Sequence, residues 1–398
     1  MKKGVFIVFG SVALIVIVLA GLLVFKFQRS LAPAPDAAPV VSQGADGVPE
    51  LTESVVLSGL SNVWDIGFLP PSEGQTESTQ TALFTERAGT ISKISEGKKV
   101  TLHTVSNVYV RGEGGLLGMA VDPNFATNRY VYACYSTPQD IRLSRWKVNE
   151  DVTALGEQKN IVTGMPVNTS VFPGRHSGCR PRFGADGFLW VGTGDTAAGT
   201  TPQDPKSLGG KVLRIDRDGH AAPGNVGGTF DARIHSYGHR NVQGLAMYTQ
   251  PKNGLYGYSV EHGPDKSDEI NPLKPGNMGW NPVPLYNELA PMTDKKKYPN
   301  AIEPIWNSGD STIAPSGMTF ITGKNWKGLE GRLAMAVLKN QHVRILELDN
   351  SGKVKSEQRL FEKKYGRIRS VVMGPGDSLY LTTDNGDAQD EIIKVSPR

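Results

Sequence analysis

The sequence predicts an all-β fold, a six-bladed β-propeller, preceded by an N-terminal transmembrane anchor helix. The 398 residues include 46 Gly and 26 Pro, and 21% of them are charged. This composition favours short strands joined by turns over a helical bundle. A strand–turn–strand unit also repeats along the chain, and an uncharged stretch near the N-terminus is long enough to cross a membrane.

The uncharged stretch is residues 4–25, a run of 22 residues with basic residues on both sides. As a helix it would span about 33 Å, which is enough to cross the hydrocarbon core of a bilayer. A cleavable signal peptide has a shorter apolar region and a small-residue cleavage site. The nearest candidate site contains Pro33, which makes it a poor cleavage site. The sequence therefore favours a retained anchor in residues 1–30 over a cleaved signal sequence, while the flanking charges leave its orientation open.

The remainder of the chain divides into a short linker and one large domain. Residues 31–50 are rich in Ala and Pro and are interpreted as a linker, followed by the propeller domain at 51–398. Four basic residues within the first 30 account for the whole net charge of +4. The main domain is therefore neutral, and no nucleic-acid partner is expected.

An internal repeat organises the large domain. It is clearest in Phe183–Asp195 (FGADGFLWVGTGD) and in Met373–Asp387 (MGPGDSLYLTTDNGD). Six such units begin near residues 68, 120, 183, 245, 319 and 373. Strand units repeated at this period are typical of propeller blades, each of which buries its faces against its neighbours. A β-sandwich with accidental repeats is the alternative.

Polar residues recur near equivalent strand exits of these units. Such positions open on one face of a propeller, around the central channel, so their side chains are expected to converge. They are Glu113, His176, Asp195, Arg240, Asn241, Lys339, Arg367 and Arg369. The four cations among them need anionic partners, which a ligand with several carboxylates would supply. Each cation could instead pair with a local acid.

His176 and Asp195 are separated by 19 residues, at the start and the end of one predicted hairpin. This placement can bring the carboxylate to the imidazole and fix its tautomer, as a general base requires. A purely structural histidine is the alternative interpretation.

The turn at Gly263–Pro264 is followed by Asp265, Asp268 and Glu269. Backbone carbonyls and carboxylates are the ligands that Ca²⁺ prefers. The twelve-residue spacing of an EF-hand is absent, and no Cys or His pair has the spacing of a zinc site. The sequence therefore favours a calcium loop of another kind.

The chain has two cysteines, Cys134 and Cys179. Two are too few for a disulfide framework. One bridge in an oxidising compartment and two buried thiols are both compatible with the sequence.

The chain resembles the quinoprotein glucose/sorbosone dehydrogenases, a family that includes the soluble glucose dehydrogenase and the aldose sugar dehydrogenases. The matching motifs occur in order across roughly residues 53–397. They are Gly112–Tyr132, His176–Asp195, Leu208–Gly219, Ile234–Ala246, Glu261–Asn271, Ile313–Gly317 and Arg367–Pro375. Several motifs in register are far more specific than any one of them alone.

The resemblance implies a propeller that binds pyrroloquinoline quinone (PQQ) and Ca²⁺ on one face. PQQ carries several carboxylates, which would meet the expected cations. Carried over by motif, His176 would be the general base, Asp195 its orienting partner, and Arg240 would face the reactive quinone carbonyl. The other cofactor-binding residues would be Glu113, Asn241, Lys339, Arg367 and Arg369.

The resemblance also implies two calcium sites. The carbonyls of Gly263 and Pro264 would bind the calcium of the cofactor. Glu269, together with the carbonyl of Met278, would form a second, structural site.

The implied reaction is the oxidation of an aldose sugar at C1 to the lactone, with hydride transfer to the quinone. Electrons would then pass to an acceptor, a quinone or a cytochrome, that the sequence does not identify. Together with the anchor at residues 4–25, this activity implies a periplasmic or otherwise extracytoplasmic domain attached to the cytoplasmic membrane.

Four departures from the family pattern are present. Glu113 replaces an amide, Val242 replaces a proline, and residues 177–181 differ from the usual sequence after the base. Arg175 stands where the soluble glucose dehydrogenase has an acid that helps to hold substrate. The last two differences bear on sugar specificity more than on the chemistry.

Two other functions remain open. A non-catalytic propeller that binds calcium and glycan would keep the calcium loop and lose the base or the cations. A calcium-dependent lactonase or esterase would need several carboxylates and amides around the channel, where this sequence places cations.

Overall fold

The computed structural model describes residues 38–41, 44, 47–71, 80–170 and 172–398. The expected membrane anchor at residues 4–25 lies outside these ranges. Within them, no helix is both long and apolar enough to span a membrane.

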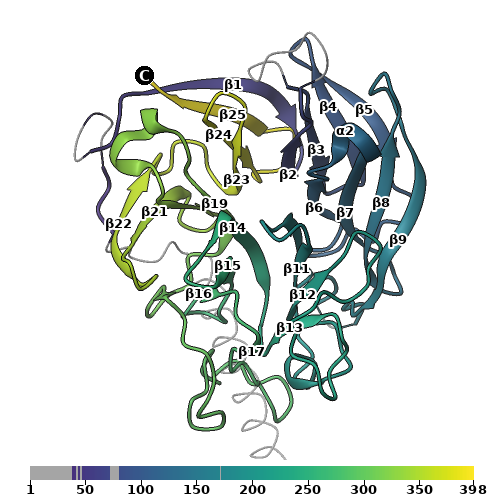
Figure 1. Cartoon of the computed structure of the whole chain (residues 1–398), viewed down its shortest axis with the longest axis vertical. Coiled ribbons are helices and arrows are strands. Elements are labelled where there is room, and N and C mark those ends of the chain that lie inside the picture. Colours follow the sequence, from purple (N-terminus) through teal and green to yellow (C-terminus); the bar gives the residue numbers. More distant parts are fainter. Residues whose placement is uncertain (1–37, 42–43, 45–46, 72–79, 171) are drawn as a thin grey trace, which may run out of the picture. The chain divides into compact units, whose positions relative to one another are not determined.

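The described residues form six β-sheets arranged around a common centre (Figure 1), here called blades 1 to 6 in chain order. The first strand of each blade lies innermost. These six strands contact one another in sequence order, and the last contacts the first, which closes the ring. The predicted six-bladed β-propeller is therefore confirmed.

Blade 1 consists of β2 (Val63–Phe68), β3 (Ala82–Glu86), β4 (Thr90–Ser95) and β5 (Lys98–Thr104). Blade 2 consists of β6 (Leu116–Val121), β7 (Tyr130–Ser136), β8 (Ile141–Val148) and β9 (Leu155–Met165), with the short helix α2 (Phe125–Asn128) between its first two strands. Blade 3 consists of β10 (Gly178–Phe183), β11 (Leu189–Thr193), β12 (Lys211–Ile215), β13 (Ile234–Tyr237) and the added strand β17 (Gly276–Asn277), and it carries the 3-10 helix η2 (Thr201–Gln203).

Blade 4 consists of β14 (Val242–Lys252), β15 (Leu255–Glu261), β16 (Glu269–Pro272) and β18 (Trp306–Asn307). Blade 5 consists of β19 (Pro315–Phe320), β20 (Leu333–Val337), β21 (His342–Leu348) and β22 (Val354–Leu360), with the 3-10 helix η3 (Lys324–Leu329) after its first strand. Blade 6 consists of β23 (Ile368–Gly374), β24 (Ser378–Thr383), β25 (Asp390–Pro397) and β1 (Leu51–Leu60).

Burial follows strand position within each blade. The second and third strands of blade 3, LWVGT and KVLRI, are buried at every residue, because both of their faces meet a neighbouring blade. The outermost strand of blade 1, KKVTLHT, is mostly exposed. The six predicted repeat starts all fall within innermost strands, so each repeat begins in the strand of its blade that lies nearest the propeller axis.

Blade 6 closes the ring with both ends of the described chain. β1 pairs antiparallel with β25, with Leu51 opposite Pro397 and Thr52 opposite Ser396. Before β1, part of the segment expected to be a linker lies along β22, where Val40 forms a β-bridge with Arg359. The N-terminal strand therefore completes the sheet that the C-terminal strands begin.

An ionic cluster is buried between the innermost strands. Asp65 and Arg180 are fully buried, and Arg180 Nη1 lies 2.8 Å from Asp65 Oδ1. Arg182 binds the other oxygen of Asp65 at 2.8 Å. Burial alone would raise the pKa of Asp65, but the two guanidiniums outweigh it and lower the pKa to about 2.

This cluster touches the innermost strand of every blade. Asp65 belongs to blade 1 and accepts a hydrogen bond from the Met119 amide of blade 2, and both arginines come from blade 3. Arg180 also donates to the Gln243 carbonyl and to the hydroxyls of Ser316 and Ser370, in blades 4, 5 and 6. One buried carboxylate and two arginines thus tie six blades together at the axis.

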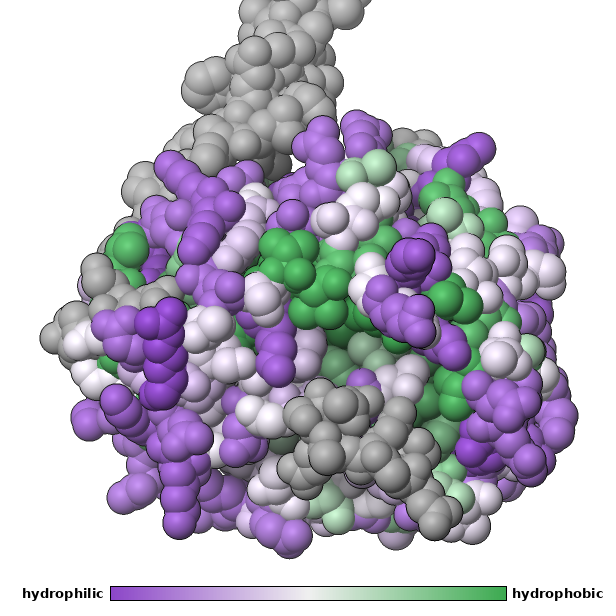
Figure 2. Space-filling view, turned by 90° about the horizontal axis from the view of Figure 1, so that it is seen from above, coloured by the Kyte–Doolittle hydropathy of each residue, from purple (hydrophilic) through white to green (hydrophobic). Residues whose placement is uncertain are grey.

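The side of the surface shown in Figure 2 is mostly hydrophilic, with hydrophobic residues grouped in its middle. Among the described residues, the exposed large hydrophobic side chains are Val40, Val55, Val100, Phe172, Leu285 and Leu289. The last three flank the site described next.

Candidate active site

The predicted site residues gather on one face of the propeller. Glu113, His176, Arg240 and Arg367 each precede an innermost strand, and Asp195 follows a second strand. In antiparallel blades the start of the first strand and the end of the second lie on the same face. The sequence placed the site near the exits of the inner strands, whereas the structure places it at their starts.

His176 and Asp195 form a buried pair. His176 Nδ1 lies 2.7 Å from Asp195 Oδ1, and the exposed fractions of the two side chains are 4% and 0%. On the other side of the ring, Arg175 Nε donates to His176 Nε2 at 3.1 Å. A carboxylate only accepts and a guanidinium only donates, so the imidazole is neutral, with its proton on Nδ1 and a lone pair on Nε2.

The Asp195 carboxylate has three further donors. Trp280 Nε1 and the Tyr286 hydroxyl each donate to Oδ2 at 2.8 Å, and the Ala197 amide donates to Oδ1 at 2.8 Å. Burial would raise the pKa of Asp195, but His176, the positive charge of Arg240 and the hydrogen bond from Trp280 outweigh it and hold the pKa below its usual value. Asp195 is therefore a fixed anion.

Trp280, Tyr286 and the half-exposed Glu288 come from the segment between β17 and β18, and the sequence-based prediction missed all three. The segment has no strand or helix periodicity, so no pattern placed it near the site. Its length was a usable signal, because a long connection without secondary structure in a compact domain is often functional.

The backbone around His176 is shaped by close packing. His176 itself has φ of 52°, in the left-handed region. At Gly178 a Cβ would lie 2.6 Å from the Gly194 amide nitrogen, so only glycine lets this hairpin close so tightly. A register shift lies between Gly178 and Arg180, which gives this end of β10 a bulge just after the base.

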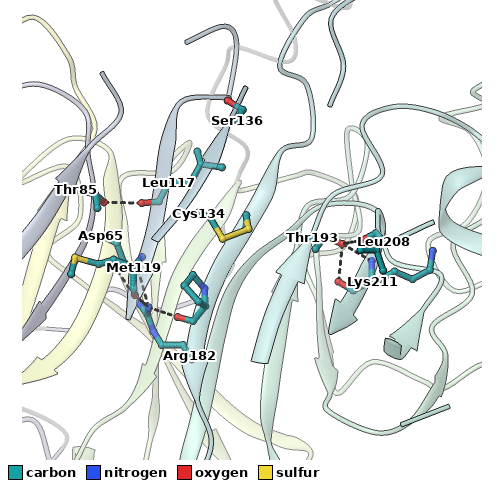
Figure 3. Close-up of a disulfide and its surroundings, with 12 residues drawn as sticks. Asp65, Thr85, Leu117, Met119, Cys134, Ser136, Arg182, Thr193, Leu208 and Lys211 are labelled. Carbon is teal, nitrogen blue, oxygen red and sulfur yellow. Dashed lines mark hydrogen bonds and ion pairs between the residues drawn. A yellow bond between two sulfur atoms is a disulfide. The ribbon is translucent and has the colours of Figure 1, made fainter. Parts of the chain in front are cut away.

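Cys134 and Cys179 form a disulfide in the structure (Figure 3). It joins β7 of blade 2 to β10 of blade 3, and Cys179 lies in the bulge that follows His176. Of the two possibilities left open by the sequence, the structure contains the bridge. It anchors the segment that follows His176 to a neighbouring blade.

Arg240 lies beside His176 and is 3% exposed. Its amide donates to Glu261 at 2.6 Å, and its guanidinium donates to the His262 carbonyl at 3.1 Å and to Glu288 at 2.7 Å. Its Nε has no hydrogen-bond partner among the described residues. Burial is the largest cause that lowers the pKa of His176, and the positive charge of Arg240 is the next.

Glu113 and Asn241 are brought together as predicted. Asn241 Nδ2 donates to Glu113 Oε2 at 2.9 Å, and Gln243 donates to the same oxygen at 3.2 Å. Burial would raise the pKa of Glu113, but the neighbouring His176 and His262 outweigh it and lower the pKa. Gln243 is a further site residue that the sequence-based prediction missed.

The predicted cations differ in their partners. Arg369 is paired with Asp384 and also donates to Gln243 at 3.3 Å. Arg369 and Arg240 each have an acid of this chain as partner, Asp384 and Glu288. For these two cations the structure therefore matches the alternative of pairing with a local acid. Arg367 donates to a backbone carbonyl at 3.2 Å, and the described residues hold no ion pair for it or for Lys339. Burial lowers the pKa of both cations.

The turn at Gly263 and Pro264 is organised by Asp268. The buried Asp268 carboxylate accepts from the Gly263 amide at 2.9 Å, from the Thr312 hydroxyl at 2.8 Å and from the Ile313 amide at 2.6 Å. It therefore acts as a brace for the loop. Backbone carbonyls of the turn remain the candidate ligands for a cation.

Glu269 is a buried acid with unusual surroundings. It stands opposite Glu261 in the pairing of β15 and β16. Burial, and then the charge of Glu261, raise its pKa well above the ordinary value. Beside it, Asn271 donates to both glutamates, at 2.8 Å and 3.5 Å, while its own Oδ1 is buried without a hydrogen-bond partner. A hard cation fits this donor set.

Met278 is buried, and its amide donates to the Tyr237 carbonyl at 2.8 Å. Among the described residues, no hydrogen bond links Met278 to Glu269. Nor do these residues contain a cluster of three or more His, Cys, Asp or Glu side chains that could hold a metal ion. A cation at Glu269 would therefore rely on backbone and amide oxygens.

A cavity of about 400 Å³ lies next to these groups. Its lining includes Pro264, Glu269, Glu288 and Glu303. It connects the turn at 263–264 with the segment that carries Tyr286 and Glu288. The site therefore has open space beside the expected cation ligands.

Comparison with known proteins identifies the family of this chain. The family described as Glucose / Sorbosone dehydrogenase matches residues 60–394. The chain is 30% identical to aldose sugar dehydrogenase YliI of Escherichia coli, over 86% of this chain and 92% of that protein. It is 29% identical to quinoprotein glucose dehydrogenase B of Acinetobacter calcoaceticus, over 51% of this chain and 48% of that protein.

Solved structures show the same similarity. The PQQ-bound form of an aldose sugar dehydrogenase from Streptomyces coelicolor matches with a TM-score of 0.73 and 30% identity, over 88% of this chain and 100% of that chain. The apo form of the soluble aldose sugar dehydrogenase of Escherichia coli matches with a TM-score of 0.74 and 28% identity, over 87% and 100%. The protein therefore belongs to the glucose/sorbosone dehydrogenase family of enzymes.

Proposed function

We propose that this protein oxidises an aldose sugar at C1 to the lactone, with PQQ and Ca²⁺ as cofactors. The observation that supports this most strongly is the neutral imidazole of His176, which presents the Nε2 lone pair while Asp195 holds the opposite nitrogen at 2.7 Å. This arrangement suits removal of a hydroxyl proton from a sugar.

In the proposed reaction, the proton of the C1 hydroxyl moves to His176 Nε2. The resulting imidazolium is stabilised by Asp195, whose pKa is held below its usual value by His176, Arg240 and the hydrogen bond from Trp280. When bound, PQQ would supply the carbonyl group that accepts the hydride from C1, and Ca²⁺ would supply a Lewis acid.

Arg240, Lys339 and Arg367 would hold the anionic groups of PQQ. The unpartnered Nε of Arg240 and the absence of described ion pairs at the other two cations support this role. Glu113, Asn241 and Arg369 would line the remainder of the pocket, since hydrogen bonds through Gln243 join them.

Calcium would bind at two places. The carbonyls of Gly263 and Pro264 would hold the cofactor's ion, in the turn that Asp268 braces. Glu269 would hold a structural ion, with the Met278 carbonyl as a further ligand. The raised pKa of Glu269 and the orphaned Oδ1 of Asn271 support this second site.

The test is reconstitution of the chain from about residue 31 with PQQ and Ca²⁺, followed by dye reduction with a panel of aldoses. We expect reduction that depends on both the sugar and the cofactor. Chelation before PQQ is added should prevent reconstitution. Confirmed PQQ binding without reduction by any aldose would instead favour a non-catalytic binding propeller.

We also propose that residues 4–25 anchor the enzyme to the cytoplasmic membrane, with the domain at 51–398 on the extracytoplasmic side. The length and lack of charge of this segment support the proposal. Fractionation of cells that express the full chain tests it. Recovery of the intact chain only in the soluble fraction would contradict it.

A further inference from the structure

One carboxylate bridges two arginines that flank the base. Glu288 Oε1 accepts from Arg240 Nη2 at 2.7 Å and also from Arg175 Nη2. The Glu288 side chain is 39% exposed, whereas that of Arg240 is 3% exposed. Glu288 is therefore the outer, more accessible member of the group, and it is shared between a buried cation and one nearer the solvent.

Arg175 contacts both Glu288 and the base, His176. Its Nη2 is held by Glu288 while its Nε donates to His176 Nε2 at 3.1 Å. Because His176 Nδ1 is engaged with Asp195, Nε2 is the nitrogen left to accept a substrate proton. The structure therefore shows the working atom of the base already hydrogen-bonded to an arginine.

The neighbours of Arg175 leave it room to move. Its side chain is 28% exposed, and its guanidinium lies 5.8 Å and 5.7 Å from the ring centres of Phe172 and Tyr286. These ring contacts are weak compared with a charged hydrogen bond. The ion pair with Glu288 is therefore the strongest described interaction that keeps Arg175 in place.

We propose that Glu288 is a positioning residue that holds the Arg175 guanidinium on His176 Nε2, so that a sugar hydroxyl reaches the base only by displacing this arginine. The displaced guanidinium stays tethered to Glu288, next to the incoming hydroxyl. The hydroxyl proton then moves to Nε2, and Arg175 keeps its own protons throughout. The proposal rests on the role of His176 as the base.

Chemical modification of His176 tests the proposal without cofactor or sugar. Diethyl pyrocarbonate acylates an unprotonated imidazole nitrogen that it can reach, and the rate at each histidine is read by peptide mass spectrometry. The full chain is treated at a pH where imidazoles are neutral. His220, whose side chain is 78% exposed, is the internal reference.

We expect Glu288→Gln and Arg175→Gln each to raise the rate at His176 severalfold relative to His220. The double variant should react no faster than either single variant, since both changes free the same nitrogen. Glu303→Gln is the matched control. Glu303 lines the same cavity, but it pairs with Lys295 at 3.2 Å and touches neither arginine.

A rate in Glu288→Gln equal to wild type, with a faster rate in Arg175→Gln, would overturn the role of Glu288. Unchanged rates in both variants would show that Arg175 does not shield His176 Nε2 from the reagent. Failure of the dehydrogenase proposal would appear elsewhere, as a wild-type enzyme that binds no PQQ or oxidises no aldose, and would leave the modification result unaffected.

Discussion

The carboxylate of Asp195 lies 2.7 Å from the imidazole Nδ1 of His176, and both side chains are buried. Bulk solvent is largely excluded from the pair, so the carboxylate sets the tautomer of the ring. The strand ends that carry them are fixed by the hairpin of blade 3 and by the disulfide to blade 2. The pair is thus a rigid element, on which the proposed chemistry depends.

Asp195→Asn should lower kcat by roughly 10²–10⁴-fold, the range of a lost general base. An amide can donate to Nδ1, which moves the ring proton to Nε2 and removes the lone pair that accepts the substrate proton.

His176→Ala should abolish turnover and leave PQQ binding largely intact. Dye-reduction kinetics and titration of the apoprotein with PQQ measure the two effects. Loss of PQQ binding in His176→Ala would mean that its role is misassigned.

Tyr286→Phe should lower kcat by roughly 10- to 100-fold while the fold remains stable. The variant removes one hydrogen bond to an ionised carboxylate, a contact that contributes about 1.5–3 kcal/mol. Tyr298→Phe is the matched control, because Tyr298 lies in the same segment but accepts from Asn281. Steady-state kinetics decide the matter, and equal effects of the two variants would argue against a specific role for Tyr286.

Much of the site could be predicted because its residues belong to local motifs. His176 and Asp195 are the ends of one hairpin, and Arg240 and Asn241 are adjacent in sequence. The repeat revealed six blades because each innermost strand carries the same apolar pattern. The sequence-based prediction put the site at the exits of the inner strands instead of at their starts. The period of the repeat alone does not fix where a unit begins.

The remaining site residues depend on tertiary packing that no local pattern shows. Trp280 and Tyr286 contact Asp195, and Glu288 contacts Arg240, from a segment without periodicity. Asp384 and Glu288 are the partners of Arg369 and Arg240, and the sequence alone identified neither acid. The pair of Arg240 and Glu288 joins residues 48 apart in the chain, so it becomes visible only in the fold.

The activity should persist below the ordinary pKa of histidine, about 6.5. Burial first, and then Arg240, lower the pKa of His176, against smaller opposing effects of Asp195 and Glu113. The base works in its neutral form, so kcat/KM should fall only as the pH drops through this lowered pKa. The pH profile of kcat/KM measures it. An acidic limb centred above 6.5 would contradict the assigned environment of the base.

Asp65→Asn should destabilise the propeller by about 3–5 kcal/mol, because it leaves Arg180 buried without its charge partner. Denaturant unfolding measures the loss, with the exposed Asp310→Asn as control. In the wild type, the lowered pKa of about 2 contributes stability that is present above the ordinary pKa of 3.8. About 2 kcal/mol should be lost as the pH falls toward 2. An unchanged midpoint in Asp65→Asn would show that the cluster does not hold the blades.

Glu269→Gln distinguishes a structural calcium site from an uncompensated buried acid. Without a cation, Glu269 faces Glu261 across the strand pair, so removing its charge should leave the protein in chelator at least as stable as the wild type. With Ca²⁺, the wild type should gain stability, about 2.7 kcal/mol at a hundredfold excess over Kd, and the variant should lose this gain. Thermal unfolding of both proteins with Ca²⁺ and with chelator measures the four values, and Glu303→Gln controls for the loss of an acid nearby. The same calcium-induced shift in wild type and Glu269→Gln would place the stabilising ion elsewhere.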